Sequence, residues 1–231
     1  MKLSKNVALL PVAREGMESL NLVLTWDNNN LVLIDAGVPG QTDDIAKAIE
    51  NEGFCIKDLT HLIITHQDWD HVGCVADILK LAPNLTIIAH IDEAPYLDGR
   101  KMPIKLAARL EEYHTMTEEQ QAAVDRWKNS YENSPISITE HVQDGHVLPI
   151  CGGIEVVHTP GHTPGHITLY LKESRVMVCG DATIARSGKL TGPNPVFTQD
   201  MEQAIASFEK IKSYDLDSVV AYHGGYIKLE V

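Results

Sequence analysis

Short apolar runs, each followed by an aspartate or a histidine, recur along the chain of 231 residues. Runs of this length that are rich in Val, Ile and Leu are typical of buried β-strands. Loops at one edge of a β layer can bring their side chains together, and such loops commonly carry catalytic groups. The residues that follow the runs are Asp35, His66, His162, Asp181 and His223. The pattern predicts a β-rich fold with a polar site at one edge.

The densest part of the pattern is "THQDWDHVG", residues 65–73, which contains His66, Asp68, Asp70 and His71. Histidine and carboxylate are ligands of Zn²⁺, Mn²⁺ and Fe²⁺. A single histidine at a strand end is usually structural, but five segments share this position. The four cysteines show no CxxC spacing, which argues against a structural cysteine-type zinc site. The segment therefore predicts a metal-binding loop.

In their order along the chain, these motifs resemble those of the metallo-β-lactamase fold superfamily. That family has Asp, then HxHxDH, then His, Asp and His. Here the motifs are Asp35 in "LIDAG", residues 66–71, His162 in "TPGHTPGH", Asp181 in "CGDA" and His223 in "YHGG". The resemblance implies an α/β (α+β) fold, an αββα sandwich with the site at one edge of two packed sheets.

The resemblance also implies a binuclear site for two divalent metal ions, with Zn²⁺ expected first. Its first metal would be held by His66, Asp68 and His162, and its second by Asp70, His71 and His223. Asp181 would bridge the two metals, and Asp35 would brace the metal loop from behind. Asp70 is the candidate catalytic residue, because in the family geometry it faces the nucleophile and can move its proton.

Asp68 departs from the family pattern, which usually has histidine at this position. It can be a first-metal ligand, whose harder oxygen favours Mn²⁺ or Fe²⁺ more than histidine does. Alternatively, the first site is weakened and only the site of Asp70, His71 and His223 fills well. A third interpretation is a solvated loop acid in a protein without activity.

Several other residues near the motifs have open roles. His166 is expected to brace a loop and not to bind metal, and Trp69 either lines the pocket mouth or packs the loop against the core. Arg186 and Lys189 are the nearest basic candidates for binding an anionic group. Another set of histidines is interpreted as structural: His61, His90, His141, His146 and His158.

The sequence is interpreted as one metallo-β-lactamase-like domain, residues 1–231, with a helical insertion at about 92–140. Residues 20–37 predict a hairpin around "DNNN", and "TDDIAKAIENEG" and "HVGCVADILKLAP" predict helices. The insertion predicts helices at about 103–114 and 118–132, the second opening with a capping box from Thr117 to Gln120. Asp200 is expected to cap a later helix, with Gln203 completing another capping box.

Apolar insertion residues could cap a pocket, although packing on the sandwich is the simpler interpretation for most of them: Tyr96, Met102, Leu106, Leu110, Tyr113 and Trp127.

The net charge of −13, from 19 basic and 32 acidic residues, argues against a nucleic-acid partner. No apolar run approaches a membrane span, and the start of the chain does not resemble an export signal. The scattered cysteines are expected to be reduced, buried thiols. These features predict a cytoplasmic protein with a small-molecule substrate. Its oligomeric state is open, with a homodimer among the possibilities.

Hydrolysis is the leading reaction class, because two adjacent divalent cations generate hydroxide near neutral pH. A metal-bound hydroxide would attack an ester, lactone or thioester of a small molecule. The first alternative is a phosphodiesterase of the same fold. The alternative from another class is a non-catalytic metal-binding or ligand-sensing domain.

Overall fold

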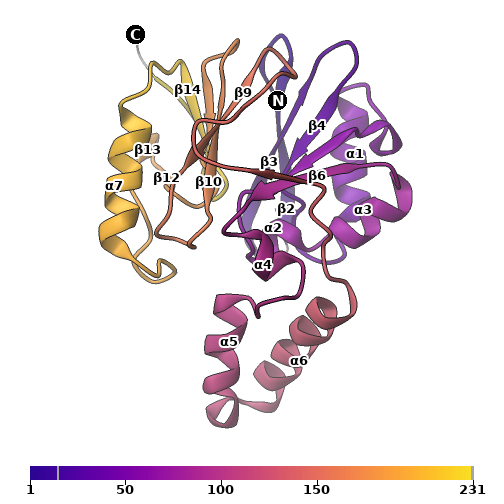
Figure 1. Ribbon diagram of the computed structural model, residues 1–231, viewed down its shortest axis with the longest axis vertical. Helices are drawn as coiled ribbons and strands as arrows, with labels where there is room; N and C mark the ends of the chain where they lie inside the picture. Colours follow the sequence, from indigo (N-terminus) through magenta and orange to yellow (C-terminus); the bar gives the residue numbers. More distant parts are fainter. Residues whose placement is uncertain (15, 230–231) are drawn as a thin grey trace.

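The computed structural model describes residues 1–14 and 16–229, which form two packed β-sheets with helices on their outer faces (Figure 1). The first sheet has the order β1-β2-β3-β4-β5-β6-β7. Its strands are β1 (Lys2–Ser4), β2 (Val7–Arg14), β3 (Met17–Trp26), β4 (Leu31–Ile34), β5 (His61–Ile63), β6 (Thr86–His90) and β7 (Glu140–Val142).

The second sheet has the order β15-β14-β11-β10-β9-β8. Its strands, in chain order, are β8 (Val147–Leu148), β9 (Ile154–His158), β10 (Ile167–Leu171), β11 (Val176–Val178), β14 (Ser218–Ala221) and β15 (Gly225–Lys228). A separate small hairpin pairs β12 (Ala185–Arg186) with β13 (Lys189–Leu190).

The main helices are α1 (Thr42–Asn51), α2 (Trp69–Val72), α3 (Val75–Leu81), α4 (Ala94–Leu97), α5 (Ile104–Glu111), α6 (Glu118–Asn133) and α7 (Met201–Lys212). Short 3₁₀ turns occur at η1 (Ile56–Asp58) and η2 (Tyr113–Thr115). Among the described residues, no helix is both long and apolar enough to cross a membrane.

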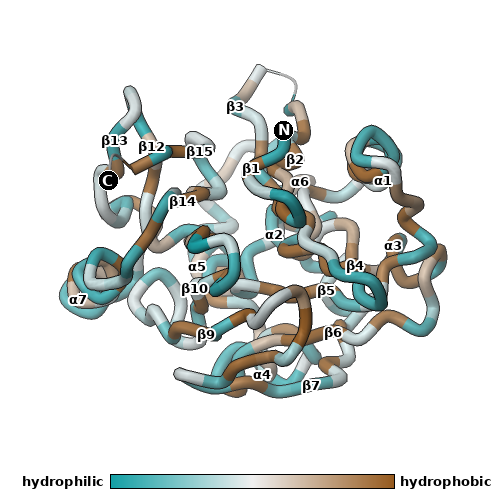
Figure 2. Tube along the Cα trace, turned by 90° about the horizontal axis from the view of Figure 1, so that it is seen from above, coloured by the Kyte–Doolittle hydropathy of each residue, from teal (hydrophilic) through white to brown (hydrophobic). Residues whose placement is uncertain are grey.

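Alternating burial along the strands produces the αββα layering. Val23 of β3 belongs to the core between the sheets, together with Val156 of β9 in the second sheet. Its neighbour Leu24 faces the other way and packs with Ile45 of α1, because successive strand residues point to opposite faces. On the far side, Ile211 of α7 packs against the second sheet. Figure 2 shows these apolar strands lying between the outer helices α1 and α7. The predicted fold class is confirmed.

The direction of the strands places the predicted site residues at one edge. Strands β4, β5 and β6 are parallel neighbours in the first sheet, and β11 and β14 are parallel in the second. Parallel strands end at the same edge of their sheet, so the residues that follow them lie together. Asp35 follows β4, and Asp181 and His223 follow β11 and β14.

Hydrogen bonds tie the two sheets together at this edge. The backbone N–H of Ile167, at the start of β10, donates to the carbonyl of Thr65 in the metal loop at 3.0 Å. The side-chain amide of Asn21 in β3 donates to the carbonyl of Tyr222 beside His223 at 2.9 Å. The loops that carry the site are therefore held by both sheets.

The secondary structure confirms the predicted hairpin and the helices of residues 92–140. Strands β3 and β4 pair antiparallel around Asp27–Asn30, and α5 and α6 occupy the predicted positions. Thr117 and Gln120 form the predicted capping box at the start of α6. In Figure 1, α5 and α6 extend from the same side of the sandwich as α2 and α4.

Two local predictions are wrong. The helix expected from "HVGCVADILKLAP" is divided into α2 and α3 near Gly73, where an added Cβ would meet the backbone nitrogen of Pro39 at 2.4 Å. Asp200 does cap α7, but the second capping box does not form, because the Asp200 N–H already donates to the carbonyl of Gly161. The Gln203 side chain instead donates to the Asp200 carboxylate.

Asp27 makes the β3–β4 turn sensitive to pH. Its carboxylate accepts from the backbone N–H groups of Asn29 and Asn30 at 2.8 Å, and from that of Cys151 at 2.7 Å. Burial alone would raise its pKa, but these hydrogen bonds together lower the pKa of Asp27 from 3.8 to about 2. The ionised form is therefore the one that stabilises the fold.

We expect the contribution of Asp27 to be fully present above about pH 4 and lost as the pH falls towards 2. Asp27→Ala should lower the free energy of unfolding at pH 7 by about 1–2 kcal/mol, and by less at pH 2.5. Urea unfolding of both proteins at the two pH values measures this. An equal loss at both pH values would contradict the assignment.

Candidate metal centre

The structure brings all seven predicted ligands together in two adjacent groups. One group contains His66, Asp68, His162 and Asp181, and the other contains Asp70, His71 and His223. Within each group the potential ligand atoms lie within 4.8 Å of one another. We call these the first cluster and the second cluster.

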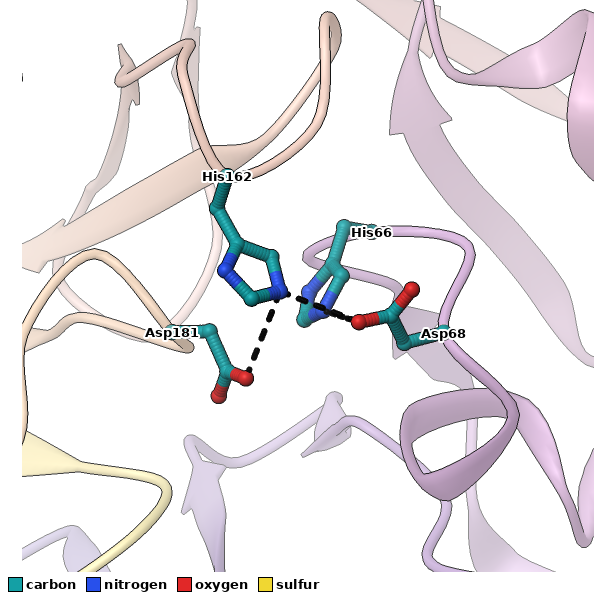
Figure 3. A group of neighbouring side chains, drawn as sticks. All are labelled: His66, Asp68, His162 and Asp181. Atoms are coloured by element: carbon teal, nitrogen blue, oxygen red, sulfur yellow. Dashed lines mark hydrogen bonds and ion pairs between the residues drawn. The ribbon is translucent and has the colours of Figure 1, made fainter. Parts of the chain in front are cut away.

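The first cluster is arranged around Asp68 and His162 (Figure 3). The Asp68 Oδ2 atom lies 3.0 Å from His162 Nε2 and 3.2 Å from His66 Nε2. His162 Nε2 is also 3.4 Å from Asp181 Oδ2. Asp68 is only 4% exposed. The interpretation of Asp68 as a solvated loop acid is therefore wrong, because its carboxylate points into the cluster.

Asp181 belongs to both clusters. Its Oδ2 atom faces His162, whereas its Oδ1 atom lies 3.3 Å from His71 Nε2 and 3.5 Å from His223 Nε2. Asp70 Oδ2 completes the second cluster at 3.4 Å from His223 Nε2. When Asp181 is counted on both sides, each cluster offers two imidazoles and two carboxylates.

Several buried atoms that could ligate a metal have no hydrogen-bond partner among the described residues. They include His66 Nε2, His71 Nε2 and Asp181 Oδ1. Buried polar atoms are normally satisfied, so unpaired atoms in both clusters call for an explanation. Imidazole nitrogen and carboxylate oxygen are ligands of Zn²⁺ and related divalent ions. The donor set therefore fits a pair of divalent cations.

Thr65 and Asp35 fix which nitrogen of each histidine faces the site. The Thr65 hydroxyl donates its one proton to the Asp35 carboxylate at 2.9 Å. Its oxygen also lies 3.0 Å from His66 Nδ1, so in that contact the His66 Nδ1–H is the donor. His71 Nδ1 lies 2.9 Å from Asp35 Oδ2, which can only accept. Both histidines are thus oriented with Nε2 towards the clusters. This is the bracing contact expected for Asp35.

The surroundings shift the pKa values of His66 and His71 in opposite directions. Burial lowers the pKa of His66 to about 4, which keeps its ring neutral. Burial would also lower the pKa of His71, but the carboxylates of Asp35 and Asp181 raise it well above its usual range. The field at His71 Nε2 therefore favours a positive charge, which either a proton or a metal ion can supply.

His166 supports the loop that carries Asp181. Its Nε2 atom accepts from the Asp181 backbone N–H at 3.1 Å, so Nδ1 carries the proton and contacts the Thr159 hydroxyl at 2.9 Å. Both ring nitrogens are occupied, which agrees with the expected bracing role. The fit is close, because a Cβ on Gly180 would lie 2.8 Å from His166 Nε2.

Three residues that contact the clusters or the loops that carry them were not identified from the sequence. The buried Glu93 carboxylate accepts from the backbone N–H of Gln67 and from that of Gly165, both at 2.8 Å, and so joins the metal loop to the loop of His162. The Tyr222 hydroxyl donates to the Asp70 carbonyl at 2.6 Å. Lys105 of α5 contacts Asp68 directly. Glu93 could have been identified from the sequence, because it follows the apolar run "LTIIAH" just as each predicted metal ligand follows an apolar run.

A cavity of about 600 Å³ lies beside the metal loop, between that loop and the helices of residues 92–140. Its lining includes Trp69, Val72, Tyr96 and Trp127, with Arg109 and Arg126 among the polar residues. Tyr96 and Trp127 are thus pocket residues, whereas Leu106 is fully buried in packing. Trp69 is 40% exposed and its ring centroid lies 6.4 Å from that of Trp127.

Arg186 and Lys189 lie on the exposed hairpin of β12 and β13, and Arg186 lines a separate hollow of about 550 Å³ beside Gly224.

His90, Asp92 and His158 also have ligand atoms close together. However, the two imidazoles stack with centroids 4.1 Å apart and an angle of 10° between their planes. The nitrogen lone pairs lie in the ring planes, so stacked parallel rings do not aim them at one ion. This geometry favours the structural role expected for these histidines.

Comparison with known proteins agrees with the fold. The model of the metallo-beta-lactamase superfamily matches residues 17–223. The chain is 32% identical to the probable metallo-hydrolase YflN of Bacillus subtilis (strain 168), over 87% of this chain and 78% of that protein. It is 21% identical to an atrochrysone carboxyl ACP thioesterase of Cryptosporiopsis sp. (strain 8999), over 90% of this chain but only 50% of that protein.

Among solved structures, a metallo-beta-lactamase family protein of Thermus thermophilus superposes with a TM-score of 0.76. Its sequence identity is 22%, and the alignment covers 98% of this chain and 76% of that one. The chain is a member of the metallo-beta-lactamase superfamily, and it is a metal-dependent hydrolase.

Substitutions at Asp35 test whether it braces the site. Asp35 has a positive φ of 63°, a conformation that asparagine tolerates better than alanine. Asp35→Asn should lower Zn²⁺ affinity by about 10–100-fold with little change in stability. Asp35→Ala should lower the affinity similarly and also destabilise the fold by about 1–2 kcal/mol.

Equilibrium dialysis against Zn²⁺ and thermal unfolding of the metal-free proteins separate these two effects. Unchanged Zn²⁺ affinity in both variants would show that Asp35 does not support the metal centre.

Proposed function

We propose that the protein is a binuclear hydrolase that cleaves an ester, lactone or thioester bond of a small molecule. The observation that carries the proposal is the position of Asp181, whose two carboxylate oxygens face different clusters. A carboxylate shared in this way supports two adjacent cations, the arrangement used by two-metal hydrolytic sites.

We propose His66, Asp68, His162 and Asp181 as the ligands of one metal, and Asp70, His71, His223 and Asp181 as those of the other. Zn²⁺ is the first candidate for both positions, since it accepts imidazole and carboxylate ligands. The carboxylate of Asp68 gives the first cluster the same donor types as the second. This supports Mn²⁺ or Fe²⁺ as alternatives, because both accept oxygen-rich sets.

Divalent cations held here would supply Lewis acidity and lower the pKa of water enough for hydrolysis near neutral pH. Asp70 is the residue of this chain placed to move a proton. Its backbone carbonyl is held by the Tyr222 hydroxyl at 2.6 Å, and its Oδ2 atom faces the site beside His223. From this position the carboxylate can accept a proton from the attacking water and deliver it to the leaving group.

The cavity beside Trp69 supports a substrate with an apolar portion. Its volume of about 600 Å³ falls in the range of small-molecule sites, and aromatic and aliphatic side chains form much of its wall. The thioesterase among the relatives supports an acyl thioester as one substrate class. All four cysteines, which lie within the described residues, are free thiols, and this supports a reducing, cytoplasmic setting.

A substrate panel tests the proposal. The protein, loaded in turn with Zn²⁺, Mn²⁺ and Fe²⁺, is assayed with lactones, acyl thioesters, alkyl esters and phosphodiesters. We expect turnover of at least one carboxylic ester, lactone or thioester, with longer acyl chains preferred because of the apolar cavity. Turnover of phosphodiesters alone would favour a phosphodiesterase, and metal binding without any turnover would favour a sensing domain.

Asp70→Asn tests the proton-transfer role. The amide retains the size of the side chain but cannot take a proton, so kcat should fall by about 10²–10⁴-fold. Metal content measured on the same sample separates this loss from loss of a ligand. Asp77→Asn, on the exposed surface of α3, is a matched control and should keep normal kcat. A fully metal-loaded Asp70→Asn enzyme with normal kcat would contradict the role.

A further inference from the structure

The first cluster already contains a positive charge from the protein itself. The Lys105 ammonium forms a close ion pair with Asp68 Oδ2, and it lies 3.0 Å from His162 Nε2. The Lys105 side chain is 28% exposed and that of Asp68 only 5%, so water screens the pair incompletely. The same Asp68 oxygen and the same His162 nitrogen face each other at 3.0 Å as donor atoms of the first cluster.

The position of Lys105 is built into the fold. Lys105 lies in the first turn of α5, where the backbone N–H of Ile104 donates to the side-chain oxygen of Gln67 at 2.8 Å. Gln67 is in turn fixed by Glu93, and it directly precedes Asp68 in the metal loop. This chain of hydrogen bonds ties the start of α5 to the metal loop, and so keeps the lysine beside Asp68.

Lys105 and a first metal would require the same atoms. A divalent ion binds carboxylate oxygen and imidazole nitrogen at about 2.0–2.2 Å, so an ammonium in contact with both atoms takes its place. Like charges at such a distance also repel strongly in a buried site. The second cluster differs, because among the described residues Asp70 forms no ion pair with lysine or arginine.

The ammonium can be released towards water. The Lys105 side chain is 28% exposed although its charged end lies in the cluster, and the exposed ring of Phe197 beside it has its centroid 5.5 Å from Lys105 Nζ. Rotation of this long, flexible side chain would therefore free Asp68 without movement of α5.

We propose that Lys105 is a built-in competitor for the first metal position, so that the two clusters fill in order, the second at low metal concentration and the first only when the ammonium is displaced. The Asp68 carboxylate, which stands where the family usually has histidine, is what allows the lysine to bind there. The protein thus has a one-metal state with Lys105 on Asp68 and a two-metal state with Lys105 released.

Metal stoichiometry tests this without reference to turnover. Lys105→Met removes the charge but keeps a flexible chain, and Lys105→Arg keeps the charge. Lys128→Met on α6 is the control, since Lys128 pairs with Glu132 on the surface. Each protein is dialysed against buffered free Zn²⁺ over several decades, and bound zinc is measured by mass spectrometry.

Wild type, Lys105→Arg and Lys128→Met should take up two zinc ions in two separated steps. Lys105→Met should bind the weaker ion about tenfold or more tightly, with the stronger step unchanged. Adding His66→Ala to Lys105→Met should abolish the tightened step, which assigns it to the first cluster. If Lys105→Met is poorly folded by circular dichroism, Lys105→Gln replaces it.

Equal zinc binding by wild type and Lys105→Met, or weaker binding by the variant, would overturn the proposal while leaving the binuclear hydrolase in place. Failure of every protein to bind zinc, Mn²⁺ or Fe²⁺ would overturn both.

Discussion

Four carboxylates converge at one edge of the sandwich, and the rest of the site depends on how their negative charge is compensated. Asp35 and Asp68 are buried, and the side chains of Asp70 and Asp181 are only 15% and 12% exposed. Carboxylates brought together out of water repel one another and lose their hydration, so they require positive charge among them. Nearby histidines and one lysine supply part of it in the protein itself. Divalent cations bound within the clusters would supply the remainder.

The surrounding fold holds this unfavourable arrangement in place. Both sheets contribute ligand-bearing loops, and the two sheets are joined at the site through Thr65 and Ile167 and through Asn21 and Tyr222. Behind the ligands, Asp35 binds His71 Nδ1 and the Thr65 hydroxyl contacts His66 Nδ1. His166 Nε2 accepts from the backbone N–H of Asp181. The site is therefore preorganised by hydrogen bonds that were formed on folding.

Much of this site could be predicted from the sequence, because its candidate ligands follow recognisable strands. The pattern of an apolar run followed by Asp or His identified all seven cluster residues, and the strand directions bring them to one edge. The bracing contact of Asp35 also followed from the resemblance. Capping at Thr117 was predictable because its partner Gln120 is three residues away.

Contacts between distant segments were not predictable in this way. Gln203 could not complete its capping box because the Asp200 N–H donates to the carbonyl of Gly161, which is far from it in the sequence. Lys105 pairs with Asp68 across 37 residues, and nothing in the local sequence of α5 distinguishes it from a surface lysine. Glu93 differs, since its position after β6 follows the same rule as the ligands. The interpretation of Asp68 changed most, because its partner lies in the helices of residues 92–140.

The most direct test of the metal centre is a crystal structure of the zinc-loaded protein with anomalous diffraction measured at the zinc edge. At saturating Zn²⁺ we expect two anomalous peaks, one among His66, Asp68 and His162 and the other among Asp70, His71 and His223, with Asp181 between them. Peaks at His90 and His158 instead, or no peak at either cluster, would contradict the assignment of this edge of the sandwich as a binuclear metal centre.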